Sequence, residues 1–253
     1  MPSSPFVIHA VAVDSAEQIV TRRQPLLVQP VTSMRAVRLD AETPAAISSA
    51  RERSFPAGTL AFGVYVRDGW AYCAIAESRL RLWSPDQYVC YIDSDNDGRF
   101  ESAIDSGEPF GGIPLLVWGQ GDVRRLPAPA PYTRIAAADG PSIEYAIGYE
   151  VVRPSGRARR GDRNVPRPAT HIAATIGFRL PDGEIHPLSG PEVGRRFPLE
   201  DGQQGSIRVH GAVIEVLAVG DDDSVRYRVI QSIPAQVEQI TLQANNTMRW
   251  GAY

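Results

Sequence analysis

Glycine and proline interrupt this chain so often that long helices have little room to form. The 253 residues include 22 glycines and 21 prolines, and the segments between them are short and apolar or alternating. The longest apolar runs, 111–118 and 212–219, fall well short of the ~20 residues that cross a bilayer and are typical of buried strands. We therefore expect an all-β protein with a substantial core and no transmembrane segment.

Alternating apolar residues indicate where several strands lie. Within 143–151 apolar side chains occupy every second position, as in a strand that turns one face to the core. The dipeptide Asp68-Gly69 separates the apolar segments 59–66 and 70–76 and predicts a tight hairpin. Turn signals of the same kind occur at 181–183 and 220–223. Such spacing without long intervening helices favours antiparallel sandwiches or barrels.

A proline-rich segment marks a candidate domain boundary. Residues 126–131 alternate proline with small residues, a composition typical of an extended polyproline II linker. We therefore predict two antiparallel β-sandwich-like domains, residues 1–125 and 132–253. Very little helix is expected, because the single candidate begins at Thr43-Pro44, a capping residue followed by proline at the first helical position, and ends near Arg53.

The charge balance argues against nucleic acid and anionic membranes as partners. The net charge is −3, and all 26 basic residues are arginine, whereas those partners normally require a basic domain. The arginine-rich segment 153–167 either binds a local anionic partner or is a solvated loop. Residues 1–5 lack the pattern of a signal peptide, so either a signal has been removed or the protein is not secreted.

The most informative motif is an acidic run in the first half of the chain. Asp93, Asp95 and Asp97 stand at alternate positions, and Gly98 follows them. Calcium prefers six to eight oxygen ligands, and alternate side chains of a tight loop converge on one centre while the carbonyl of Arg99 adds another ligand. Three crowded carboxylates without a cation would repel one another. The spacing therefore predicts a site for one Ca²⁺.

Over these few residues the run resembles the calcium loops of EF-hand and dockerin proteins. An EF-hand loop carries a bidentate glutamate at its twelfth position, and here that residue is Ile104. The closing ligand must come from elsewhere, and Glu101, Asp105 and Glu108 are the candidates. Residues 87–92 are typical of a strand, where an EF-hand has a helix, so we expect a constitutive structural site rather than a regulatory switch.

Two further features are expected to brace this loop. Phe100 occupies the place of the buried apolar residue that anchors such loops to a core. Cys73 and Cys90, the only cysteines, lie in neighbouring predicted strands, and a disulfide between them would contribute ~3 kcal/mol in the chain-entropy model. The alternative is two buried free thiols in a reducing compartment. Calcium and a disulfide together favour an extracellular, periplasmic or cell-surface location.

No motif identifies a reaction, since the chain has neither a Gly-x-Ser-x-Gly elbow nor a phosphate-binding glycine loop. We expect a calcium-stabilised structural or interaction protein of the bacterial cell envelope or exterior, which self-associates or binds another envelope protein or a glycan. One alternative is a carbohydrate-binding module. A second is a glycoside hydrolase whose carboxylate pair comes from distant strands, although we favour a protein without enzymatic activity. The aromatic platform of a sugar site could come from Trp70, Trp83, Trp118 or Trp250.

Overall fold

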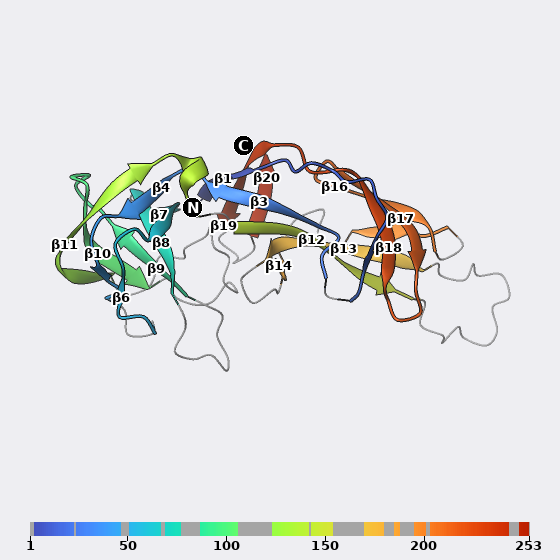
Figure 1. Cartoon of the computed structure of the whole chain (residues 1–253), viewed down its shortest axis with the longest axis horizontal. Helices are drawn as coiled ribbons and strands as arrows, with labels where there is room; N and C mark the ends of the chain where they lie inside the picture. The colour runs from blue at the N-terminus through green and yellow to red at the C-terminus, as the bar shows by residue number, and fades with distance from the viewer. Residues whose placement is uncertain are drawn as a thin grey trace.

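The computed structural model has an all-β fold with an elongated outline (Figure 1). A barrel forms one end, two sheets extend to the other, and both chain termini lie near the middle. Among the described residues the single helical element is the short 3-10 turn η1 (Ala137–Asp139), and none of their helices is long and apolar enough to cross a membrane. The structure describes residues 3–22, 24–46, 51–66, 69–76, 87–105, 123–141, 143–153, 170–179, 185–187, 195–200, 203–242 and 248–252.

Six antiparallel strands close the barrel in the order β10-β11-β4-β7-β8-β9. The hairpin predicted at Asp68-Gly69 is confirmed, because β7 and β8 pair up to Val66 and Gly69; residues 67–68 of its turn lie outside the described ranges. The strands are β4 (Ala36–Leu39), β7 (Leu60–Val66), β8 (Gly69–Ala76), β9 (Gln87–Ile92), β10 (Arg99–Asp105) and β11 (Val123–Ile135).

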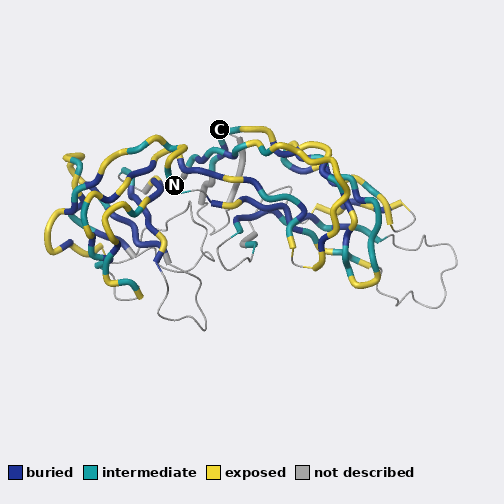
Figure 2. The backbone as a smooth tube through the Cα atoms, viewed as in Figure 1, coloured by how far each residue is buried: buried dark blue, intermediate teal, exposed yellow. Residues whose placement is uncertain are grey.

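The barrel wall is buried on both faces along β8 and β9 (Figure 2). Tyr72 and Tyr91 belong to the core inside the barrel. Their neighbours Cys73 and Cys90 belong to a second core, which continues from the outer face of the barrel into the two sheets. Strands buried on both faces read as continuous apolar runs, which explains why these two segments show no alternation of apolar and polar residues.

An eight-stranded antiparallel sheet extends from the barrel in the order β14-β13-β12-β3-β1-β19-β20, and β15 also pairs with β13. In this sheet β1 lies between β3 and β19 and so joins the two ends of the chain. The strands are β1 (Ser3–Ile8), β3 (Leu27–Ser33), β12 (Ile143–Val152), β13 (His171–Arg179), β14 (Ile185–Pro187), β15 (Arg196–Pro198), β19 (Gln236–Leu242) and β20 (Met248–Ala252).

A four-stranded sheet in the order β16-β17-β18-β2 shares its core with the large sheet. Phe6 and Tyr145 each contact Phe178 edge to face, and Ile214 and Tyr227 contribute to the same core from the smaller sheet. The turn predicted at 220–223 joins β17 to β18. The strands are β2 (Gln18–Val20), β16 (Gly205–Val209), β17 (Ala212–Val219) and β18 (Val225–Gln231), and β5 (Thr43–Pro44) pairs separately with β6 (Ser54–Phe55).

The all-β class and the antiparallel sheets are confirmed, but two details of the predicted organisation differ. Residues 126–131, predicted as a linker, lie within β11, where Ala130 pairs with Phe100 of the barrel. The proline-rich composition is compatible with this strand because proline is tolerated where a ladder hydrogen bond is absent. Moreover, β1, β2 and β3 join sheets that are formed mainly by the second half of the chain.

The helix predicted from Thr43 to about Arg53 is wrong for its described residues. Thr43 and Pro44 form β5, and the backbone N–H of Ala45 donates to the carbonyl of Arg53. Ala46 follows with a positive φ of 56°, which a right-handed helix does not allow. Pairing with β6 therefore overrides the local capping signal; residues 47–50 lie outside the described ranges.

Candidate metal centre

The acidic loop connects β9 to β10 in the barrel wall. β9 ends at Ile92 and β10 begins at Arg99, so the loop is flanked by strands, as predicted. Asn96 and Gly98 adopt left-handed conformations with φ values of 61° and 90°, which glycine adopts readily and asparagine more easily than most residues. These two residues fold the loop tightly, so that side chains from both strand ends can meet.

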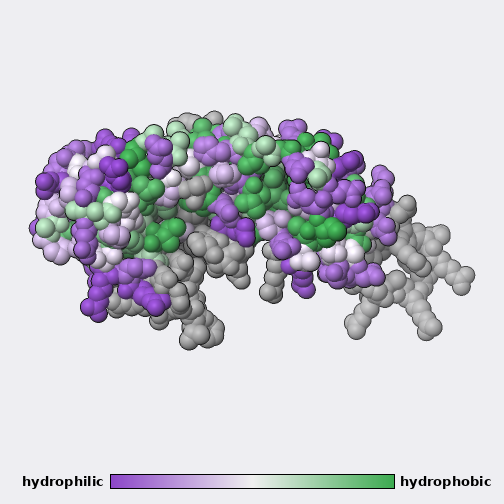
Figure 3. All heavy atoms as spheres, in the orientation of Figure 1, coloured by the Kyte–Doolittle hydropathy of each residue, from purple (hydrophilic) through white to green (hydrophobic). Residues whose placement is uncertain are grey.

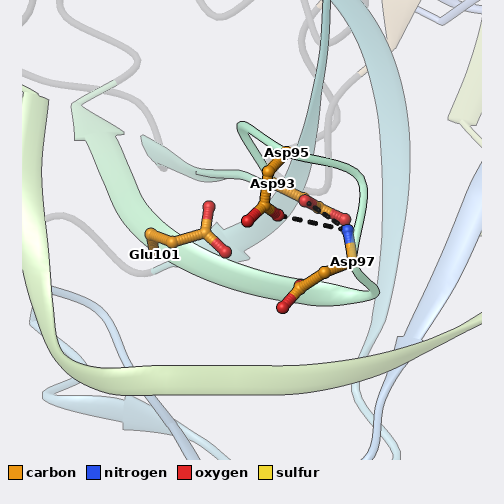
Figure 4. A group of neighbouring side chains, drawn as sticks. All are labelled: Asp93, Asp95, Asp97 and Glu101. Carbon is orange, nitrogen blue, oxygen red and sulfur yellow. Dashed lines mark hydrogen bonds between the residues drawn. The ribbon is translucent and has the colours of Figure 1, made fainter.

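Four carboxylates converge in this loop (Figure 4). Asp93, Asp95, Asp97 and Glu101 each offer one oxygen, and these four oxygens all lie within 4.8 Å of one another. Calcium holds its ligands at about 2.3–2.6 Å, so oxygens on opposite sides of one ion are separated by roughly 5 Å. The spacing of the cluster therefore matches the coordination sphere of a single cation.

Asp93 is the most buried and most hydrogen-bonded member of this cluster. Its Oδ2 accepts hydrogen bonds from the Tyr132 hydroxyl at 2.8 Å and the Gly98 N–H at 3.0 Å, and its Oδ1 accepts one from the Asp97 N–H at 3.2 Å. Burial acts to raise the pKa of Asp93, but these hydrogen bonds outweigh it, and the pKa lies below its ordinary value. The carboxylate form is therefore held in place before any cation binds.

Backbone amides also orient the other three carboxylates. Asp97 Oδ1 accepts from the Arg99 N–H at 2.8 Å, and Asp95 Oδ1 accepts from the Asp97 N–H at 3.2 Å. Glu101 Oε2 accepts from both the N–H and the hydroxyl of Ser94, at 2.9 and 3.0 Å. These hydrogen bonds use one oxygen of each of the three carboxylates, so the second oxygen of each can serve as a cation ligand.

The main chain of Arg99 faces the same loop. Arg99 pairs with Pro131 across β10 and β11, and the Tyr132 N–H donates to the carbonyl of Gly98 at 3.2 Å. This bond makes Arg99 and Pro131 a non-hydrogen-bonded pair, in which the N–H and C=O of Arg99 point away from β11. The N–H reaches Asp97, and the carbonyl points to the same side. The role of this carbonyl as a ligand stays a prediction.

Aromatic packing fixes the loop to the interior of the barrel. Phe100 is fully buried, as predicted, and stacks on Tyr132 with ring centroids 4.2 Å apart and on Tyr91 at 5.3 Å. Burial, and then the hydrogen bond to Asp93, raise the pKa of Tyr132 to about 12. Tyr132 therefore remains a hydrogen-bond donor and joins the acidic loop to the barrel core. This role of Tyr132 could not be predicted from the sequence, because no local pattern indicates that β10 pairs with β11.

Among the candidates for the closing ligand, the structure brings Glu101 into the cluster. Ile104, at the position of the EF-hand glutamate, is buried in the core outside the barrel. Asp105 ends β10 opposite Val89, four residues beyond Glu101, or roughly 13 Å along an extended strand. The side chain of Asp105 and the whole of Glu108 lie outside the described residues.

The predicted disulfide is present. Cys73 and Cys90 are bonded to each other and occupy directly opposite positions of β8 and β9. Cys90 lies three residues before Asp93, so the crosslink holds the strand that leads into the loop.

The other predicted features are only partly described. The guanidinium of Arg35 lies over the ring of Trp70, 4.4 Å from the ring centroid. In the arginine-rich segment Arg153 forms an ion pair with Asp223 and donates to the Gly220 carbonyl at 2.7 Å. Residues 154–169, Trp83, Trp118 and the side chain of Trp250 lie outside the described ranges.

Fold and loop together define an all-β protein with a disulfide-braced candidate cation site. Comparison with protein-family models, with curated proteins and with solved structures gave no match. A functional conclusion therefore depends on the chemistry of the site itself.

Proposed function

We propose that this chain is a calcium-stabilised structural or interaction protein of the bacterial cell envelope or exterior. The observation that carries the proposal is the convergence of four carboxylate oxygens within 4.8 Å. Together with the Arg99 carbonyl and solvent, these side chains offer the six to eight oxygen ligands that calcium takes in flexible geometry. Magnesium demands a stricter octahedron and keeps more of its own water, so the donor set favours calcium.

Calcium would act here as a permanent brace. The ion would neutralise the repulsion among the four carboxylates and fix the turn between β9 and β10 to β11, through the hydrogen bond of Asp93 to Tyr132. The described flanks are strands rather than a pair of helices that could open, which suits a constitutive site. Extracellular calcium sites work at 10⁻⁴–10⁻³ M, and a disulfide persists in the same oxidising surroundings.

The proposal is tested by titrating the metal-free protein with calcium while recording heat, melting temperature and particle size. We expect binding of one ion, with a stabilisation of about 2.7 kcal/mol when calcium reaches 100 times its Kd, and a much smaller effect of magnesium. The variant Asp95→Asn/Asp97→Asn should lose this response. The matched control is Asp221→Asn, in an exposed acidic turn of the smaller sheet, which should keep it.

Two results would contradict the proposal in different ways. A melting temperature that EDTA leaves unchanged, together with no binding heat, would remove the calcium site. If the protein stays monomeric at every calcium and protein concentration, self-association is excluded, but the proposal of calcium binding is unaffected.

A carbohydrate-binding role receives less support from the described residues. Trp70 packs against the core inside the barrel, Arg35 covers one face of its ring, and Tyr65 meets it edge to face at 5.6 Å. A sugar platform needs an open aromatic face, so Trp70 is a poor candidate for this use.

A further inference from the structure

The first strand leaves the large sheet at a defined point. β1 pairs with β3 from Phe6 to Ile8, and the His9 N–H then donates to the carbonyl of Pro30 at 3.0 Å. Proline has no N–H with which to return this bond. The side-chain amide of Gln29 replaces it and donates to the carbonyl of His9 at 2.9 Å. The ladder between the two strands ends there.

Beyond this point β3 continues beside β12 down to Leu27. The N–H and C=O of alternate residues in a strand point to the same side. Since the carbonyl of Pro30 faces β1, the N–H and C=O of Val28 face the same side, where β1 no longer runs. The described residues place no strand there, and no backbone hydrogen bond among them engages Val28 on that side, so its N–H and C=O face the vacated space.

A pocket of about 380 Å³ lies at this vacated position. Its walls are β3, the inner face of β18 and the segment 10–17, which crosses from one sheet to the other. Ligand sites in proteins occupy about 300–1,000 Å³ and are mostly apolar with a few polar groups. The volume falls in this range, but the lining is more mixed: apolar side chains are joined by Asp14 and Gln18, and Tyr227 donates to Gln18 Oε1 at 2.9 Å on one side. Its other principal residues are Val11, Val13, Leu27, Val28 and Val229.

We propose that this pocket receives an extended polypeptide segment of a partner protein, which pairs with the main chain of Val28. The segment would continue the line of β1 beside β3, a form of strand addition in which backbone bonds give affinity and side-chain pockets give specificity. Small apolar side chains at alternate positions fit the valine and leucine lining. A compact apolar molecule would leave the donor and acceptor of Val28 unused, so an extended chain is the better complement.

The test uses the full chain, labelled with ¹⁵N, and the capped peptide acetyl-Thr-Val-Thr-Val-Thr-amide. We expect the peptide to shift the amide signal of Val28 and to slow its hydrogen exchange at least about tenfold. A fully N-methylated copy keeps the side chains but has no backbone N–H donors, and should bind at least about tenfold more weakly. Both titrations are performed with calcium and with EDTA, so that the result does not depend on the metal site.

Three variants locate the binding site. Val28→Pro removes the N–H that faces the pocket while sparing the bonds to β12, and should weaken binding at least about tenfold. Ala12→Trp fills the pocket from the exposed crossing segment and should do the same, which provides a decisive variant if Val28→Pro does not fold. The control Ile19→Ser changes an exposed residue of β2 that is not among the pocket lining, and should bind normally.

Equal binding of the N-methylated copy would overturn the proposal and would indicate a site for small apolar molecules. Absence of any shift at millimolar peptide, or unchanged binding by Ala12→Trp, would overturn it as well.

Discussion

The barrel and the two-sheet region reach stability by different means. The barrel uses one continuous part of the chain, in which β7, β8, β9, β10 and β11 pair in sequence order. It contains both cysteines and a buried aromatic cluster. The large sheet instead joins distant segments, because Ser3 pairs with Thr241, and its shared core contains many aliphatic residues.

This difference explains where each region can support function. Neighbouring strands lose little loop entropy when they pair, and a crosslinked, densely packed wall can hold four like charges close together. In the two-sheet region the chain leaves the large sheet after β1 and crosses to β2 of the smaller sheet. Pro30 leaves the edge of β3 open at that crossing. A tight ion site therefore suits the barrel, whereas an open strand edge suits the sheets.

The largest effect is expected from removing the centre of the aromatic cluster. Phe100→Ala should destabilise the protein by about 3–5 kcal/mol, because it leaves a cavity among stacked rings. Urea unfolding followed by tyrosine fluorescence would measure this loss. The control Leu60→Ala, at a residue of the same barrel that is 38% exposed, should cost less than about 1 kcal/mol. Equal losses in the two variants would show that the barrel does not depend on its aromatic core.

Loss of the disulfide should have the next largest effect. Replacing both Cys73 and Cys90 by alanine opens a crosslink between residues 17 positions apart, which should cost about 3 kcal/mol in the chain-entropy model. A reducing agent should lower the stability of the native protein by a similar amount and leave the double variant unchanged. If reduction shifts the unfolding midpoint of neither protein, local packing alone closes the barrel.

Local patterns in the sequence predicted the class of fold and the acidic loop well. The dipeptide Asp68-Gly69 and the spacing of Asp93, Asp95 and Asp97 act within a few residues, so their consequences can be inferred without knowing the tertiary structure. The disulfide was predictable for the same reason, since Cys73 and Cys90 lie in neighbouring strands.

Features that depend on distant pairing could not be inferred. Residues 126–131 have the composition of a linker, yet they form part of β11, because the barrel supplies partners that the local sequence does not reveal. The hydrogen bond from Tyr132 to Asp93 spans 39 residues and follows from that pairing. The role of Gln29 beside Pro30 likewise becomes visible only when β1 and β3 are seen together.

The smallest predicted effect compares two aspartates that have lowered pKa values, one in each region. Asp93 is buried, and the hydrogen bonds that outweigh its burial come from Tyr132 and the loop amides. Asp222 lies in the exposed turn before β18, where the hydroxyl and N–H of Ser224 lower its pKa. A carboxylate with a lowered folded pKa stabilises the protein above its unfolded pKa of about 3.9, and this contribution is lost as the pH falls through the folded value.

Melting temperatures measured in EDTA between pH 7 and pH 2 would separate the two aspartates. The Asp93→Asn variant should lose less stability than the native protein as the pH falls through the acid part of this range, because the hydrogen bonds of Asp93 are shielded from water. The Asp222→Asn variant should differ much less from the native protein in its loss of stability with falling pH, because hydrogen bonds and charges at an exposed turn compete with solvent. If Asp222→Asn reduces the acid loss of stability as strongly as Asp93→Asn, burial in the barrel gives the acidic loop no electrostatic advantage over an ordinary surface turn.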